Sequence, residues 1–245
     1  MVDEIGMSSA KILCFDDMIL KVERQCEESE NEYRMMQWLR HKIPVPEILY
    51  YEQSQHISYL LMSKLRGEML CSSCFLTNPH ELIRMLAEGL KLLWSVDISS
   101  CPYNNAIENK LRLAESRVKD GLCSVDDSEP ETYGANGFKS PSELLEWLKC
   151  NKPTEEYVFS HGDFCLPNIF SRDGKIEGFL DLGRSGIADR YQDIALCYRS
   201  LKDNFDGRYG GKPVADFDIS ELFSQLQIEP NWEKIHYYIL LDELF

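Results

Sequence analysis

His161-Gly162-Asp163-Phe164-Cys165-Leu166-Pro167-Asn168, followed by Phe179-Leu180-Asp181-Leu182-Gly183-Arg184, is the stretch that decides the fold of this chain. Asp163 and Asn168 lie five positions apart, and Asp181 lies thirteen positions beyond Asn168. Phosphoryl transfer from a nucleotide needs a carboxylate at the acceptor hydroxyl, followed by a carboxamide and a second carboxylate at the metal. The order and spacing of these three side chains therefore indicate that chemistry. The alternative is three solvated loop residues with coincidental spacing.

The local sequence predicts that these three side chains converge in space. Residues 157–159 form a short β-prone run, so Asp163 falls where a strand opens into a loop. Asp173-Gly174 lies between two apolar runs and is a strong two-residue hairpin signal. A hairpin there folds the second strand back beside the loop, which carries Asp181 toward Asn168.

The layout parallels two protein-kinase elements, His-Arg-Asp…Asn and Asp-Phe-Gly, written here as His-Gly-Asp…Asn and Asp-Leu-Gly. A closer resemblance is to the aminoglycoside 3′-phosphotransferases. It is carried by FSHGDFCLPNIF at 159–170, DGKIEGFLDLGRSGIADRYQDIA at 173–195 and WEKIHYYILLDELF at 232–245, and it extends over nearly the whole chain. The resemblance implies an α+β, two-lobed protein-kinase-like fold. Residues 1–66 would form a nucleotide-binding lobe with a small antiparallel sheet, and residues 67–245 a larger, mainly helical lobe for catalysis and substrate binding.

The resemblance also implies a reaction and its main groups. ATP and Mg²⁺ are the expected cofactors, and the expected product is an aminoglycoside phosphorylated on a hydroxyl, with the 3′-hydroxyl as the expected position. Asp163 is the implied catalytic base, Asn168 and Asp181 are the implied Mg²⁺ ligands, and Arg184 is expected near the transferring phosphate. A transition state of this kind is stabilised mainly by positioning and electrostatics.

In the first lobe, residues 11–15 and 18–22 are predicted to pair as a hairpin, with the family's first strand largely missing before it. Lys21 on the second strand is the implied phosphate contact, aided by Ser8 in the preceding turn, because neither a Walker A loop nor GxGxxG is present. Glu32, on a predicted helix over 27–40, is the implied partner of Lys21, and Glu28, one turn earlier, is the alternative. Residues 62–67 are expected to be the hinge at the adenine edge, with a plain connector as the alternative. The implied hinge residues are Met62, Ser63 and Leu65.

Carboxylates are concentrated between Asp120 and Glu146 and at the C-terminal end. The resemblance implies that they bind the ammonium groups of the drug; a solvated acidic loop and frayed terminal charges are the alternatives. Asp193 matches a family aspartate that hydrogen-bonds the catalytic-loop backbone. Ser140 to Glu143 reads as a capping box, which gives Glu143 a structural role. The implied substrate-binding residues are Glu129, Glu131, Arg199, Asp203, Asp242, Glu243 and Phe245.

The composition limits the kinds of binding partner and the cellular compartment that we expect for this protein. A net charge of −15 argues against nucleic acid and favours a cationic ligand. No apolar run approaches the ~20 residues of a membrane span, and the first residues lack a secretory signal, so a cytoplasmic protein without a membrane partner is expected. Nine cysteines without framework spacing, including the single CxxC at Cys71 and Cys74, fit reduced thiols.

Two other readings share part of this pattern. A kinase for another small cation, such as choline, would have the same central motif, although the acidic end Asp242-Glu243 favours the drug enzymes. A noncatalytic module with this fold would not need the complete set of Asp163, Asn168 and Asp181. A protein kinase is disfavoured because no Ala-Pro-Glu element follows Asp181. The sequence carries no signal for an oligomeric state.

Overall fold

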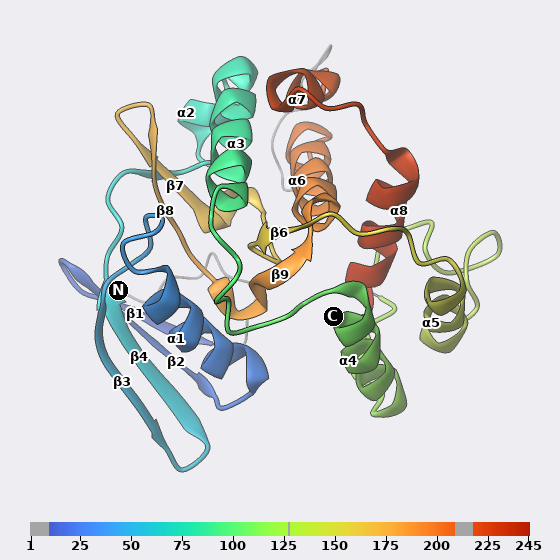
Figure 1. Ribbon diagram of the computed structural model, residues 1–245, viewed down its shortest axis with the longest axis horizontal. Coiled ribbons are helices and arrows are strands. Elements are labelled where there is room, and N and C mark those ends of the chain that lie inside the picture. Colours follow the sequence, from blue (N-terminus) through green and yellow to red (C-terminus); the bar gives the residue numbers. More distant parts are fainter. Residues whose placement is uncertain (1–9, 127, 209–217) are drawn as a thin grey trace.

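The computed structural model describes residues 10–126, 128–208 and 218–245 (Figure 1). Ser8 and most of its turn lie outside the described residues. The chain forms a small antiparallel sheet with one helix, followed by a larger part that is mainly helical. The expected α+β class is therefore confirmed, whereas the boundary after residue 66 stays a prediction.

The first sheet has the strand order β1-β2-β4-β3, with every neighbouring pair antiparallel. Strands alternate their side chains between two faces, and the face that carries Lys21, Leu60 and Met62 is buried. The Tyr33 ring of α1 stacks on Tyr51 of β3 with ring centroids 3.8 Å apart. The helix therefore covers the face on which Lys21 lies. The elements are β1 (Lys11–Cys14), β2 (Met18–Arg24), α1 (Glu27–Leu39), β3 (Ile48–Ser54) and β4 (Ile57–Ser63).

The predicted hairpin after the catalytic loop is confirmed. Arg172 pairs with Lys175 across a two-residue turn in which Asp173 and Gly174 have φ of 53° and 72°. Two positive φ angles give the turn the twist that a tight hairpin requires. Two short strands, β5 and β9, add to this region by pairing with segments far away in the chain. The elements are β5 (Glu68–Met69), β6 (Tyr157–Ser160), β7 (Ile169–Arg172), β8 (Lys175–Phe179) and β9 (Gly186–Asp189), with single turns at Leu166–Asn168 and Leu182–Arg184.

The helices of the second part surround an apolar core, and α3 contributes a fully buried stripe to it. Asn78 precedes α3, but its side chain makes no capping hydrogen bond, and Pro79 occupies the first position of the helix. The Ser140 side chain does cap α5, while Glu143 accepts from the Lys139 amide and not from that of Ser140. The helices are α2 (Ser73–Leu76), α3 (Pro79–Trp94), α4 (Ile107–Lys119), α5 (Pro141–Cys150), α6 (Arg190–Phe205), α7 (Ser220–Leu226) and α8 (Trp232–Asp242).

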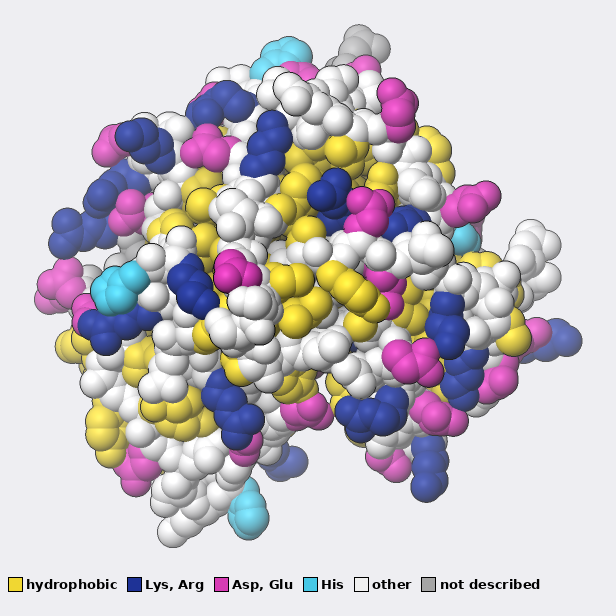
Figure 2. All heavy atoms as spheres, viewed as in Figure 1, with side chains coloured by type: hydrophobic (Ala, Val, Ile, Leu, Met, Phe, Trp, Pro, Cys, Tyr) yellow, Lys and Arg dark blue, Asp and Glu magenta, His cyan; other side chains and the backbone are white. Residues whose placement is uncertain are grey.

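Several surface features bear on partners. Basic and acidic side chains are interspersed over the face shown in Figure 2, so the net charge of −15 is not gathered into one patch there. Within the described ranges, no helix is both long and apolar enough to cross a membrane. All nine cysteines are free.

Candidate active site

The Asp163 carboxylate is fixed by two side chains of its own loop. Asn168 Nδ2 donates to Asp163 Oδ2 at 2.9 Å and to the Asp163 carbonyl at 3.0 Å. The Cys165 thiol donates to Asp163 Oδ1 at 3.0 Å. Burial raises the pKa of Cys165 well above its usual value, so the thiol keeps the proton that it donates. The carboxylate is therefore oriented before any acceptor binds.

Hydrogen bonds to Asp193 of α6 fix the backbone of the loop that carries Asp163. Asp193 is completely buried and accepts from the amides of His161 at 2.8 Å and Gly162 at 2.9 Å, and from the Ser160 hydroxyl at 2.9 Å. Burial raises the pKa of Asp193, while these donors favour its charged form. The structural role expected for Asp193 is confirmed.

Gly162 sets how closely this loop approaches the segment after Asp181. Its φ is 83°, and a Cβ at this position would come within 1.9 Å of the Arg184 carbonyl oxygen. Only glycine fits such a contact in this conformation. The catalytic loop and the Asp-Leu-Gly-Arg segment are therefore packed backbone against backbone.

Lys21 links the two parts of the molecule at Asp181. Its Nζ donates to Glu32 Oε2 and to Asp181 Oδ1, both at 2.8 Å. Burial opposes its charge, but the carboxylates of Glu32, Asp181 and Glu23 outweigh that effect and raise the pKa of Lys21. Glu28 pairs instead with Arg184 at 3.1 Å, so the structure selects Glu32 as the partner of Lys21.

Asp181 itself has a left-handed backbone, with φ of 59° and ψ of 54°. A non-glycine residue in this region is uncommon and is held there by its surroundings. Burial raises the pKa of Asp181, but the Lys21 ammonium outweighs it, and the pKa of Asp181 is lowered overall. The Asp181 side chain is therefore held in its charged carboxylate form.

The expected hinge residues differ in what they can offer a nucleotide. The Ser63 amide already donates to the Glu47 carbonyl at 2.8 Å, as the end of β4. In the described part of the chain the Leu65 amide donates to no recorded acceptor. The Leu65 side chain lies against Gly178 of β8, where an added Cβ would be 2.7 Å from Leu65 Cδ2. Met62 is buried in the core. Leu65 is thus the better hinge donor of the three.

Four of the expected substrate residues come together around the end of α8. Asp242 pairs with Arg199, and with Arg184 at 3.5 Å. The Glu129 amide donates to Glu243 Oε1 and Oε2 at 3.2 and 3.3 Å, and burial raises the pKa of Glu243 to about 7. The terminal carboxylates are therefore not frayed, and Asp242 is already neutralised by internal arginines.

Of the three remaining predicted substrate residues, Glu131 and Phe245 are placed differently. The Glu131 side chain is exposed and forms no recorded hydrogen bond or ion pair among the residues described, so the structure does not bring it into the group. The Phe245 ring lies among three cations, 5.2 Å from Lys110 Nζ and 5.6 and 5.8 Å from the guanidinium carbons of Arg117 and Arg184.

The sequence did not predict the roles of three residues at this site or at its periphery. Arg208 binds Asp203 at 3.2 Å and Glu129 at 2.7 Å, and Arg117 donates to the Leu244 carbonyl at 2.8 Å. Cys165 was within the quoted motif but was given no role. Of these three residues, only Cys165 could have been identified from the sequence, because it lies two residues after Asp163.

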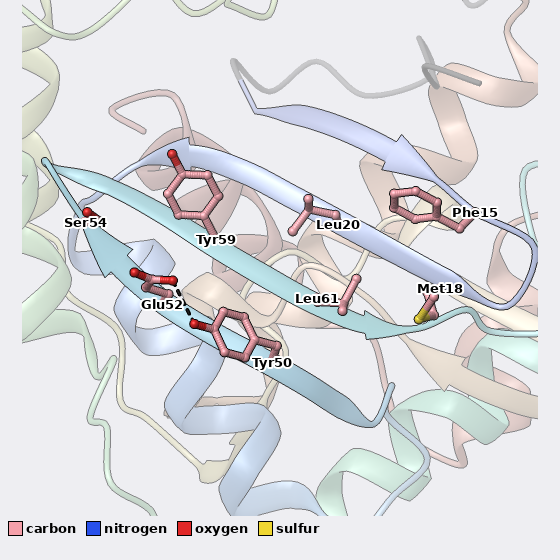
Figure 3. Close-up of a pocket in the computed structure, with 8 residues that line it drawn as sticks. All are labelled: Phe15, Met18, Leu20, Tyr50, Glu52, Ser54, Tyr59 and Leu61. Atoms are coloured by element: carbon pink, nitrogen blue, oxygen red, sulfur yellow. Dashed lines mark hydrogen bonds between the residues drawn. The ribbon is translucent and has the colours of Figure 1, made fainter.

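A surface groove of about 550 Å³ lies elsewhere, on the outer face of the first sheet (Figure 3). Its lining side chains project from β2, β3 and β4 on the face opposite α1, and Phe15 adds to them from the turn between β1 and β2. Within the groove, Tyr50 donates to Glu52 at 2.7 Å. Lys21 points to the other face, so this groove is separate from the site of Asp163 and Asp181. The lining residues are Phe15, Met18, Leu20, Tyr50, Glu52, Ser54, Tyr59 and Leu61.

The arrangement can position a hydroxyl at Asp163 and a phosphate chain near Lys21, with carboxamide and carboxylate oxygens from Asn168 and Asp181 between them. A sheet lobe, a lysine paired to a helix glutamate and this loop–hairpin pair together define a phosphotransferase of the kinase-like class.

Comparison with known proteins agrees. The chain matches the phosphotransferase enzyme family over residues 6–234. It is 41% identical over 255 aligned residues to an aminoglycoside 3′-phosphotransferase of Enterococcus faecalis, covering 99% of this chain and 92% of that protein. The crystal structure of an aminoglycoside 3′-phosphotransferase of type VIII superposes with a TM-score of 0.82 at 26% identity, covering 100% of this chain and 93% of the other. An aminoglycoside phosphotransferase of Streptomyces rimosus, solved with ADP and streptomycin, gives a TM-score of 0.77 at 24% identity over 93% of this chain and 86% of its own.

This chain therefore belongs to the phosphotransferase enzyme family, among the aminoglycoside 3′-phosphotransferases. The expected kinase-like fold and the expectation of a transferase are confirmed.

Proposed function

We propose that this enzyme transfers the γ-phosphoryl group of ATP to the 3′-hydroxyl of an aminoglycoside, in the cytoplasm, and so confers resistance to the drug. Two hydrogen-bonded pairs support the proposal, Asn168 with Asp163 and Lys21 with Asp181. The pairs are linked because the amide of Leu180, the neighbour of Asp181, donates to the Asn168 backbone carbonyl at 2.9 Å. The relatives' activity and the nucleotide in the Streptomyces rimosus complex also support the proposal.

The residues present fit a magnesium ion. The Asn168 side-chain nitrogen donates to Asp163, so the side-chain oxygen Oδ1 of Asn168 is left to bind a metal. Asp181 offers a charged carboxylate. These are the hard oxygen ligands that Mg²⁺ prefers, and Mg²⁺ usually takes one or two protein ligands together with substrate phosphates. No cluster of three or more His, Cys, Asp or Glu side chains suited to a metal occurs in the described ranges, which is consistent with a metal held jointly with the nucleotide. When bound, the ion would neutralise charge on the transferring phosphate.

The chain's own residues would act mainly by positioning. Asp163 would accept a hydrogen bond from the attacking hydroxyl and take its proton as the bond to phosphorus forms. Lys21, held by Glu32, would contact the phosphates, and Leu65 would meet the adenine edge. Arg184, held by Glu28 and Asp242, would add positive charge near the transferring group. Glu129, Asp203, Asp242 and Glu243 would face the ammonium groups of the drug.

The test is release of ADP from ATP in the presence of kanamycin, with the product's mass and phosphorylated position determined. We expect Asp163→Ala to lower kcat by more than about 100-fold while ATP still binds, because the acceptor hydroxyl loses its base and its orientation. A drug lacking the 3′-hydroxyl should not be phosphorylated. Full activity of Asp163→Ala would overturn the mechanism, and turnover of choline in place of all drugs would overturn the substrate class.

A further inference from the structure

Arg208, just beyond the end of α6, holds two carboxylates that come from distant parts of the chain. Its guanidinium contacts Glu129 Oε1 at 2.7 Å and Asp203 Oδ1 and Oδ2 at 3.2 and 3.3 Å. Its own amide donates to the Asp203 carbonyl at 3.1 Å, so the backbone keeps the side chain close to that residue. One internal cation thus joins the acidic loop to α6.

The same two carboxylates are connected to the acceptor site through direct contacts. The Glu129 amide binds Glu243, the neighbour of Asp242. Asp203 lies one helical turn after Arg199, the partner of Asp242. Asp242 also pairs with Arg184 at 3.5 Å, and the Arg184 carbonyl lies against Gly162, the neighbour of Asp163. A chain of contacts therefore runs from Glu129 and Asp203 to the loop that carries Asp163.

We propose that Arg208 is an internal competitor of the substrate: it occupies the subsite for a substrate ammonium group formed by Glu129 and Asp203, and thereby weakens the binding of polycations. The inference rests on the proposed function. A guanidinium offers these carboxylates the same charge and N–H donors that an ammonium group would, and they cannot satisfy both at short range.

The Arg208 side chain is 39% exposed, so water and salt screen its ion pairs and a substrate can displace it. The apparent affinity for the substrate is reduced by the fraction of molecules in which the subsite is free. For ion pairs of this exposure, removal of the competitor should lower KM for a polycationic drug about two- to fivefold. The kcat value should not change, because Arg208 touches none of Asp163, Asn168 and Asp181.

The experiment compares Arg208→Gln with Arg208→Lys and with a matched control, Arg84→Gln. Arg84 on α3 is 42% exposed and also binds two carboxylates, Glu81 at 2.7 Å and Glu88 at 3.0 Å. Its replacement changes the net charge equally, so it controls for long-range electrostatics. KM and kcat for kanamycin are measured at two salt concentrations for each variant.

We expect Arg208→Gln to have a lower KM, a steeper rise of KM with salt and the kcat of the unmodified enzyme, while Arg208→Lys and Arg84→Gln stay close to the unmodified enzyme. An unchanged or higher KM for Arg208→Gln, or an equal fall in Arg84→Gln, would overturn the inference. Calorimetric binding of kanamycin, measured in parallel, separates the two proposals. If neither the unmodified enzyme nor any variant phosphorylates the drug but Arg208→Gln binds it more tightly, the proposed function is wrong and the competition by Arg208 is supported. If the unmodified enzyme phosphorylates the drug but Arg208→Gln binds it no more tightly, the proposed function is supported and the competition by Arg208 is wrong.

Discussion

At the scale of single residues, Glu243 gives the site a dependence on pH. Burial raises its pKa to about 7, with the Glu129 amide acting in the opposite direction. Below that pH the side chain is mostly protonated and neutral, and above it the carboxylate is available to attract an ammonium group. We therefore expect KM for the drug to fall as the pH rises through about 7.

The measurement is KM against pH for the enzyme and for Glu243→Gln, from about one pH unit below 7 to one unit above. The drug's own amines titrate for both proteins, so the ratio of the two KM values isolates Glu243. That ratio should change several-fold across the interval. A ratio that is constant with pH would show that Glu243 does not titrate at the drug.

The catalytic motif could be predicted from the sequence, whereas the ion pairs around Glu243 could not. The motif spacing placed Asp163, Asn168 and Asp181 correctly in one loop–hairpin unit because their separation is local and is set by a turn with its own sequence signal. The arginine partners of Asp242, Glu129 and Asp203 could not be read in the same way. Arg184 follows Asp181, Arg199 lies on α6 and Arg208 comes after α6, and only tertiary packing brings them to the end of α8 and the acidic loop.

At the scale of elements, α6 works as the support of the catalytic loop through Asp193. Replacement of Asp193 by Asn would turn an N–H₂ group toward one of the two loop amides and leave that buried donor unpaired. We expect Asp193→Asn to lower the free energy of unfolding by about 1–3 kcal/mol. It should also lower kcat about tenfold or more, because a misplaced base is costly even when folding survives.

Urea unfolding and steady-state kinetics of the same preparation test this. Lys202→Ala, an exposed change on the same helix, is the control and should alter neither quantity appreciably. If Asp193→Asn is destabilised but retains full kcat, α6 stabilises the lobe without positioning the base.

Some helices and strands could be predicted from the sequence, and others could not. The helix over 27–40 and the hairpin of residues 11–15 and 18–22 were predicted, because helical periodicity and turn residues are local signals. The strands β5 and β9 were not, since each is short and exists only by pairing with a segment far away in the chain.

At the scale of the whole molecule, the two lobes are joined at the site where the nucleotide should bind. Lys21 and Glu32 belong to the sheet lobe and Asp181 to the helical lobe, and the Asn31 side chain of α1 donates to the Gly183 and Ser185 carbonyls at 2.9 Å. A metal–nucleotide complex bound here would contact both lobes and stabilise their docking. At a concentration 100-fold above its dissociation constant, a ligand adds about 2.7 kcal/mol to the free energy of unfolding.

We expect Asp181→Asn to lose the part of this stabilisation that depends on magnesium. The amide has the shape of the carboxylate but lacks the charge that the metal and Lys21 both use, so the nucleotide alone should still bind weakly while added Mg²⁺ gives little further increase in melting temperature. Asp173→Asn is the matched control, since Asp173 carries the same carboxylate at 92% side-chain exposure in the hairpin turn and asparagine tolerates its positive φ. Thermal unfolding with a non-hydrolysable ATP analogue, with and without Mg²⁺, measures the difference. A magnesium-dependent shift in Asp181→Asn as large as that of the unmodified enzyme would place the metal on other groups and separate the joining of the lobes from nucleotide binding.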